Sequence, residues 1–232
     1  MRALLVMALA AAALAVPAAT PAQQRGAAAQ RDWTRTVAAT PEGGFRMGNP
    51  AARVKVVEYL SLTCPHCAAF AHEGTPRLIA DHVRTGRVSL EYRNYVLNAY
   101  DLAATSLTRC AAPARYFAMS HELLGTQSAW MGRMQNLSDA QRSELRGLQP
   151  LQAMQRIATL LGLDAIAARH GIAPAAQRAC LSNQAAFDRI GALRQAAAAA
   201  GVNGTPTYAI NGQILQVNDW PSIQQAIRQA GG

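Results

Sequence analysis

The sequence predicts an α/β fold in which a sheet domain is interrupted by an all-helical insertion. Residues 54–62 (VKVVEYLSL) are rich in β-branched and aromatic side chains, which favours a buried strand. A helical stretch runs from Pro65 to Gly86, and residues 88–96 (VSLEYRNYV) alternate as a second strand does. Together these segments predict a β-α-β unit.

The predicted secondary structure changes twice in the rest of the chain. From residue 98 to about residue 200, helical patterns dominate and no segment reads as a strand. Residues 207–210 and 213–217 then predict a hairpin, because Asn211-Gly212 between them is a type I′ turn signal. A final helix is expected over residues 220–230, so the order after the insertion is β-β-α.

Two short strands are also predicted ahead of the β-α-β unit. They cover residues 32–37 (DWTRTV) and 45–47 (FRM), and the turn signal PEGG at residues 41–44 separates them.

The composition excludes some classes of protein. Of the 232 residues, 50% are hydrophobic, which is enough for a buried core and too many for a disordered chain. The formal net charge is +9, and Lys55 is the only lysine, so arginine carries almost all of the positive charge. These arginines are scattered and form no basic block, so we expect no nucleic-acid partner.

The N-terminus resembles an export signal. Arg2 is followed by an apolar run over residues 3–16 and by the small residues PAATPA, a pattern typical of a cleaved signal peptide. Cleavage is expected after Ala18 or Ala22; an uncleaved amphipathic anchor is the alternative. The resulting division is a signal peptide at 1–22, a flexible segment with a short strand at 23–44, a sheet domain at 45–97 and 201–232, and the helical insertion at 98–200.

The cysteines indicate redox chemistry. Cys64 and Cys67 form a C-P-H-C motif at the predicted strand-to-helix junction, where residues three apart share one helix face. Cys64 would lie at the helix N-terminus, whose unpaired N–H groups and positive dipole end favour a thiolate, and a protonated His66 would add positive charge. Stabilising the reduced form in this way makes the disulfide a stronger oxidant.

A C-P-H-C motif has three other possible interpretations. A zinc site is disfavoured because the other two cysteines, Cys110 and Cys180, are not paired at ligand spacing. Haem attachment requires a histidine directly after the second cysteine, where Ala68 stands. An inert structural disulfide is the third. The sequence therefore predicts a redox-active pair with no metal and no bound cofactor.

The segment from Val57 through the C-P-H-C motif resembles the DsbA family, the thioredoxin-fold thiol:disulfide oxidoreductases of the bacterial periplasm. The similarity spans about residues 45–230 and implies a thioredoxin-like fold. It implies a cis-proline at Pro206, with Thr205 before it at a position that tunes redox behaviour. It also implies that Glu58 is a buried acid that assists proton transfer to Cys67; a glutamate facing solvent is the alternative.

We expect the two remaining cysteines, Cys110 and Cys180, to form a structural disulfide that holds the insertion together, as in some relatives of this family. Two free buried thiols, or a second redox relay, are the alternatives. The loop that the bridge would close is about 70 residues long, which corresponds to about 4 kcal/mol on the chain-entropy model.

The resemblance implies a periplasmic enzyme that donates disulfides to reduced exported proteins and is reoxidised by a DsbB-like membrane quinone reductase. A disulfide isomerase or reductase of the same fold is the alternative, since Thr205 is familiar from isomerases. A peptide-binding chaperone is a third candidate. Only about 30 residues lie between the predicted cleavage site and the first core strand, too few for a dimerisation domain, so a monomer is expected.

Overall fold

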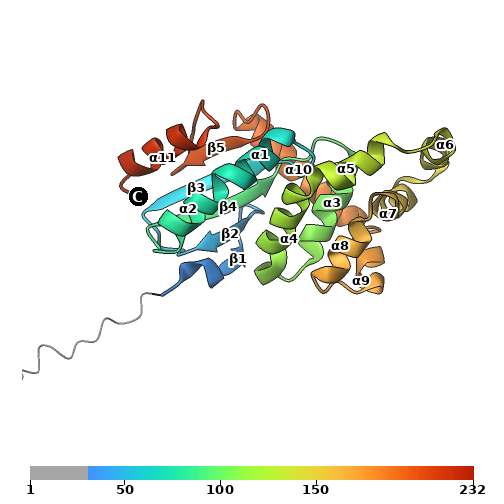
Figure 1. The fold of residues 1–232 in the computed structure, drawn as a ribbon, viewed down its shortest axis with the longest axis horizontal. Helices are drawn as coiled ribbons and strands as arrows, with labels where there is room; N and C mark the ends of the chain where they lie inside the picture. The colour runs from blue at the N-terminus through green and yellow to red at the C-terminus, as the bar shows by residue number, and fades with distance from the viewer. Residues whose placement is uncertain (1–30) are drawn as a thin grey trace, which may run out of the picture. The chain divides into compact units, whose positions relative to one another are not determined.

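The computed structural model describes residues 31–232, and these residues fold around one six-stranded sheet (Figure 1). The strands lie in the order β1-β2-β4-β3-β5-β6, and within the sheet β3 and β4 are parallel while the other neighbours are antiparallel. The strands are β1 (Val37–Ala39), β2 (Phe45–Gly48), β3 (Val54–Leu60), β4 (Val88–Asn94), β5 (Thr207–Ile210) and β6 (Gln213–Ile214).

The helices fall into three groups along the chain. Between β3 and β4 lie α1 (Pro65–Glu73), α2 (Thr75–Leu78) and a π-helical turn, η3 (Ile79–Val83). After β6 comes α11 (Trp220–Gln229). Between β4 and β5 lie α3 (Ala99–Cys110), α4 (Pro113–Gly125), α5 (Gln127–Gln135), α6 (Asp139–Gly147), α7 (Pro150–Leu161), α8 (Leu163–Arg169), α9 (Pro174–Cys180) and α10 (Gln184–Ala199).

The central strand β3 has apolar residues on both of its faces because helices cover both sides of the sheet. Val56 and Leu60 pack into the larger core together with Phe70 of α1. Val57 belongs to a second cluster with Ala197 of α10. Successive side chains of a strand point to opposite faces, so a strand buried on both sides reads as an almost continuous apolar run.

Three elements differ in detail from the sequence prediction. Residues 32–37 were predicted as one strand, but Trp33–Arg35 forms a 3₁₀ turn, η2, because the Asp32 carboxylate accepts the Thr34 N–H at 3.0 Å. The second hairpin strand is shorter than predicted, Gln213–Ile214 rather than 213–217. The helix predicted over 65–86, with a bend near Gly74-Thr75-Pro76, is interrupted at Gly74 as expected, but it ends in the π-helical turn η3 at Val83 rather than at Gly86.

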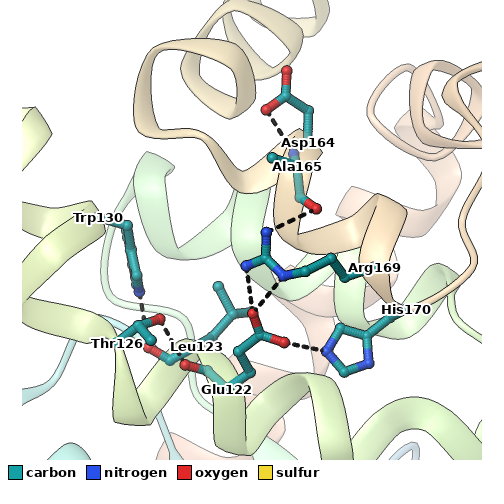
Figure 2. A network of polar contacts seen from close by, with 8 residues as sticks. All are labelled: Glu122, Leu123, Thr126, Trp130, Asp164, Ala165, Arg169 and His170. Carbon is teal, nitrogen blue, oxygen red and sulfur yellow. Dashed lines mark hydrogen bonds and ion pairs between the residues drawn. The ribbon is translucent and has the colours of Figure 1, made fainter.

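Polar contacts join α4 of the insertion to two neighbouring helices, α8 and α5 (Figure 2). The Glu122 carboxylate of α4 binds the Arg169 guanidinium and, at 2.7 Å, Nε2 of His170, just after α8. On the same turn of α4, the Leu123 carbonyl accepts the indole N–H of Trp130 at 2.8 Å. These contacts fix α4 against α8 and α5.

A disulfide between Cys110 and Cys180 joins the end of α3 to the end of α9. Its two Cα atoms are 6.1 Å apart, and it links residues separated by 70 positions. The bridge lies wholly within the insertion, while Cys64 and Cys67 are free.

The predicted signal peptide lies outside the described residues, and the proposed boundaries at residues 44, 97 and 201 stay a prediction. Within residues 31–232, no helix has both the length and the apolar character needed to cross a membrane.

Replacing both Cys110 and Cys180 by serine should lower the free energy of unfolding by about 4 kcal/mol, because the unfolded chain regains the freedom of a loop of about 70 residues. Urea denaturation of the double variant and the wild type measures the difference. Since the bridge is remote from the other cysteine pair, the reactivity of Cys64 should not change; a changed reactivity would show that the bridge also shapes the site.

Candidate active site

The candidate site lies at the junction of β3 and α1. A short loop follows Leu60, and Cys64 is then the N-cap of α1 in extended conformation, with φ −82° and ψ 122°. Pro65 occupies the first helical turn, where its missing N–H has no intrahelical partner to lose. No side chain caps this helix, so its first N–H groups are available to the Cys64 sulfur.

Several donors converge on the Cys64 sulfur. The hydrogen bond from the Cys67 thiol lowers the pKa of Cys64 most, and burial raises it. Hydrogen bonds from the Thr205 side chain and from the backbone N–H groups of Cys67 and His66 lower the pKa further. Together they lower the pKa of Cys64 from 9.0 to about 5. Cys64 is therefore a thiolate at neutral pH, the form that attacks disulfides and leaves readily.

Cys67 has the opposite environment. It is fully buried, whereas Cys64 retains an exposed fraction of 5%. Burial raises the pKa of Cys67 far above its ordinary value. The hydrogen bond that the Cys67 thiol donates to Cys64, and the negative charge of Glu58 when it is ionised, raise this pKa further. Of the two sulfurs, Cys64 is thus both the accessible one and the better leaving group.

Glu58 lies on β3 and faces the same side of the sheet as the cysteine pair. It is 1% exposed, so the alternative of a solvent-facing glutamate is wrong. Its neighbours in register are Tyr92 on β4 and Tyr208 on β5, both buried. Burial raises the pKa of Glu58 to about 8, only partly offset by the phenol of Tyr208, so its carboxyl is mainly protonated at neutral pH.

Pro206 lies beside the cysteines from the opposite part of the chain. The Thr205–Pro206 bond is cis, and the Cys64 sulfur lies 3.1 Å from the Thr205 carbonyl oxygen, to which it donates only when it is protonated. The Thr205 hydroxyl is buried and has no partner of its own among the described residues, which leaves it free to donate to the thiolate. The structure thus brings together the residues that the sequence singled out, although more than 140 positions separate Cys64 from Pro206.

An open groove of about 710 Å³ begins at this point and runs along α1. Exposed His66 and buried Pro206 line its end nearest the cysteines, and Phe70 and Trp220 contribute aromatic surface. The groove also contains Glu73, Arg77 and Asp219, so its lining carries both charges. Such a groove can receive an extended peptide next to the reactive sulfur.

Sequence reasoning missed two residues of the insertion that contact the loop before Cys64. Asp101 at the start of α3 accepts hydrogen bonds from Ser61 and from the backbone of Leu62. Gln127, the first residue of α5, donates to carbonyls of the same loop. Neither residue belongs to a motif, and both are far from Cys64 along the chain, so no local pattern identifies them.

No group of three metal-binding side chains lies together within residues 31–232. His82 and His121 lie on helical segments, where His82 is buried and His121 is partly buried. His121 bonds to the Tyr92 hydroxyl at 3.1 Å, and burial lowers its pKa to about 4.

A sequence model of the family described as Thioredoxin matches residues 40–229. The chain belongs to this family. Among solved structures, the protein-disulfide isomerase of Novosphingobium aromaticivorans is 31% identical, with a TM-score of 0.74 over 81% of this chain and 97% of that one. The α-DsbA1 protein of Wolbachia pipientis is 20% identical, with a TM-score of 0.65 over 80% and 90%, and has the same fold. The expected resemblance to DsbA proteins and the predicted thioredoxin-like fold are confirmed.

Curated relatives carry names that agree with an enzyme of this kind. A protein of Rickettsia bellii, provisionally named a protein-disulfide oxidoreductase, is 26% identical over 82% of this chain and 65% of its own length. A similarly named protein of Rickettsia conorii is 30% identical over 72% and 52%. The chain therefore spans between about half and two thirds of the length of these two relatives.

The reduced protein should show a thiolate absorbance at 240 nm that rises with a midpoint near pH 5, because hydrogen bonds favour the charged form of Cys64. Titration between pH 3 and pH 9 measures it, and the C64S variant should lose the transition. Since the pKa of Cys67 lies above this range, a C67S variant should keep one transition at low pH. A C67A variant, which has no donor at this position, should show a raised midpoint because the thiol hydrogen bond to Cys64 is lost. A wild-type midpoint near 9 would contradict the assignment.

Proposed function

We propose that this protein is a thiol:disulfide oxidoreductase that donates its Cys64–Cys67 disulfide to reduced exported proteins. The observation that carries the proposal is the asymmetry of the pair: Cys64 has a pKa of about 5 and some exposure, whereas Cys67 is buried with a raised pKa. A stabilised Cys64 thiolate favours the reduced enzyme, and that makes its disulfide oxidising.

The reaction transfers two electrons from a substrate dithiol to the enzyme disulfide. A substrate thiolate attacks the accessible sulfur of Cys64, forms a mixed disulfide and expels Cys67. Because the pKa of Cys67 is strongly raised, the expelled sulfur takes up a proton, and Glu58, protonated at neutral pH, is the buried acid on that side of the sheet. The second substrate thiolate then attacks its partner sulfur and releases Cys64 as a stable thiolate.

Disulfide isomerisation is the second candidate function, and two observations favour it. The Novosphingobium aromaticivorans protein, 31% identical, is described as a protein-disulfide isomerase. Thr205 precedes the cis-proline, and the family resemblance implies that a threonine at this position is found in isomerases as well. An isomerase starts from the reduced enzyme, so the two functions differ in the reduction potential they require.

The reduction potential of the Cys64–Cys67 pair, measured against a glutathione buffer, separates the two. A donor of disulfides should give a value near about −120 mV, because its reduced form is stabilised. Both Cys110 and Cys180 are replaced by serine so that only one pair titrates. A value at or below about −200 mV would overturn the donor function and favour isomerase or reductase activity.

The proposal extends to the periplasm as the compartment, reached by cleavage of the N-terminal signal. Two cysteine pairs are typical of an oxidising compartment, where disulfides persist. There a DsbB-like membrane quinone reductase would reoxidise Cys64 and Cys67, and the protein would act as a monomer without a bound cofactor or nucleic acid.

Export predicts a defined N-terminus for the mature protein. Cleavage after Ala18 or Ala22 leaves Ala19 or Gln23 as the first residue, which N-terminal sequencing of protein recovered from the periplasmic fraction identifies. Replacing Leu4 and Leu5 by arginine interrupts the apolar run and should keep the chain unprocessed. Mature wild-type protein that retains residues 1–18 would contradict cleavage and support an anchor.

A further inference from the structure

We propose that Gln127 of the helical insertion is a positioning residue for Cys64: its side-chain amide holds the carbonyl groups on either side of Thr63, and so sets where the Cys64 sulfur lies against α1. This role rests on the proposed function of Cys64 as the reacting sulfur. It also gives the insertion a part in the chemistry beyond covering the sheet domain.

The contacts of Gln127 are specific. Its Nε2 donates to the Leu62 carbonyl at 2.8 Å and to the Cys64 carbonyl at 3.0 Å, and the residue is 9% exposed. The Cys64 carbonyl also accepts the Ala68 N–H at 3.2 Å, which is the first backbone hydrogen bond of α1. One amide therefore binds the loop and the N-cap peptide of the helix together.

The same loop is fixed on its other side by Asp101, which is fully buried. Its carboxylate accepts the Ser61 hydroxyl at 2.6 Å and the backbone N–H groups of Leu62 and Leu97 at 3.0 Å. A buried carboxylate is tolerated only where several donors satisfy it, and two of these three donors come from the loop that leads to Cys64. The backbone N–H of Leu62 donates to Asp101, and the backbone carbonyl of Leu62 accepts from Gln127. Both backbone polar groups of Leu62 are therefore bound by side chains of the insertion.

This fixation matters because the effect of a helix N-terminus on a charge falls off within one turn. The backbone N–H groups of His66 and Cys67 lower the pKa of Cys64 only while the N-cap peptide keeps its orientation. Without the Gln127 amide, the Cys64 carbonyl keeps only its bond from Ala68, and the peptide can rotate. The sulfur then spends less time near its donors, and the thiolate loses stability.

Gln177 offers a matched control within the same insertion. Gln177 is 6% exposed, and its Nε2 also donates to two backbone carbonyls, that of Ile172 at 2.7 Å and that of Asp164 at 3.1 Å. Neither of these two carbonyls belongs to the site. Methionine has similar length and no donor, so Q127M and Q177M each remove two side-chain hydrogen bonds of the same kind. Both variants should lose similar stability in urea.

Only Q127M should change the thiol chemistry. We expect its thiolate transition at 240 nm to move up by about one pH unit, and alkylation of Cys64 at pH 4 to slow about tenfold. Its equilibrium with glutathione at pH 7 should move about tenfold toward the disulfide. Q177M should match the wild type in all three measurements. Q127N, which keeps an amide but is one methylene shorter, should behave as Q127M and serves if the latter does not fold.

Two outcomes would overturn the positioning role. In the first, Q127M loses stability as Q177M does but titrates and equilibrates as the wild type, so its hydrogen bonds are structural only. In the second, both variants shift equally, so the shift reflects general loosening of the insertion. A wild-type midpoint near pH 9 would instead refute the proposed function, and the difference between Q127M and wild type would still decide the role of Gln127.

Discussion

The chemistry of this protein depends on the position of the Cys64 sulfur at the start of α1, where the Cys67 thiol and, to a smaller extent, the N–H groups of the first helical turn lower its pKa. No side chain caps the helix, so the N–H groups of its first turn are left without a side-chain oxygen of the kind that serine or aspartate supplies in other helices. The arrangement separates two chemically identical groups: one thiol becomes acidic at the end of the helix, and the other, one turn further on, is enclosed in the core.

Most of the sheet and the centre of the site could be predicted from the sequence, because strong local patterns encode them. The apolar run of β3, the C-P-H-C motif and the Asn211-Gly212 turn each act over a few residues, and the structure places all three as expected. The turn has positive φ at both central residues, as type I′ requires. The prediction of a strand over residues 32–37 was wrong for a reason that is also local. The Asp32 side chain stabilises a turn at this point, and strand propensities do not include that effect.

The supporting residues of the site could not be predicted because they act at long range. Asp101 looks like an ordinary acidic residue in the first turn of a helix, and Gln127 like an ordinary surface glutamine. Their contacts with the loop are 39 to 65 positions away in the chain. Only tertiary packing of the insertion against the end of β3 turns these common residues into partners of the reactive loop. The insertion and the sheet domain are therefore coupled at the point where the chemistry occurs.

The disulfide of the insertion makes the protein dependent on the kind of reaction proposed for it. A chain exported from its N-terminus presents Cys64, Cys67 and Cys110 before Cys180, although the native partner of Cys110 is the last of the four. Non-native bridges between the early cysteines are therefore available first, and the native one must wait for α9. Under the function proposed above, newly made molecules would themselves be substrates of the molecules already present, and the yield of correctly paired protein would depend on the oxidising capacity of the compartment.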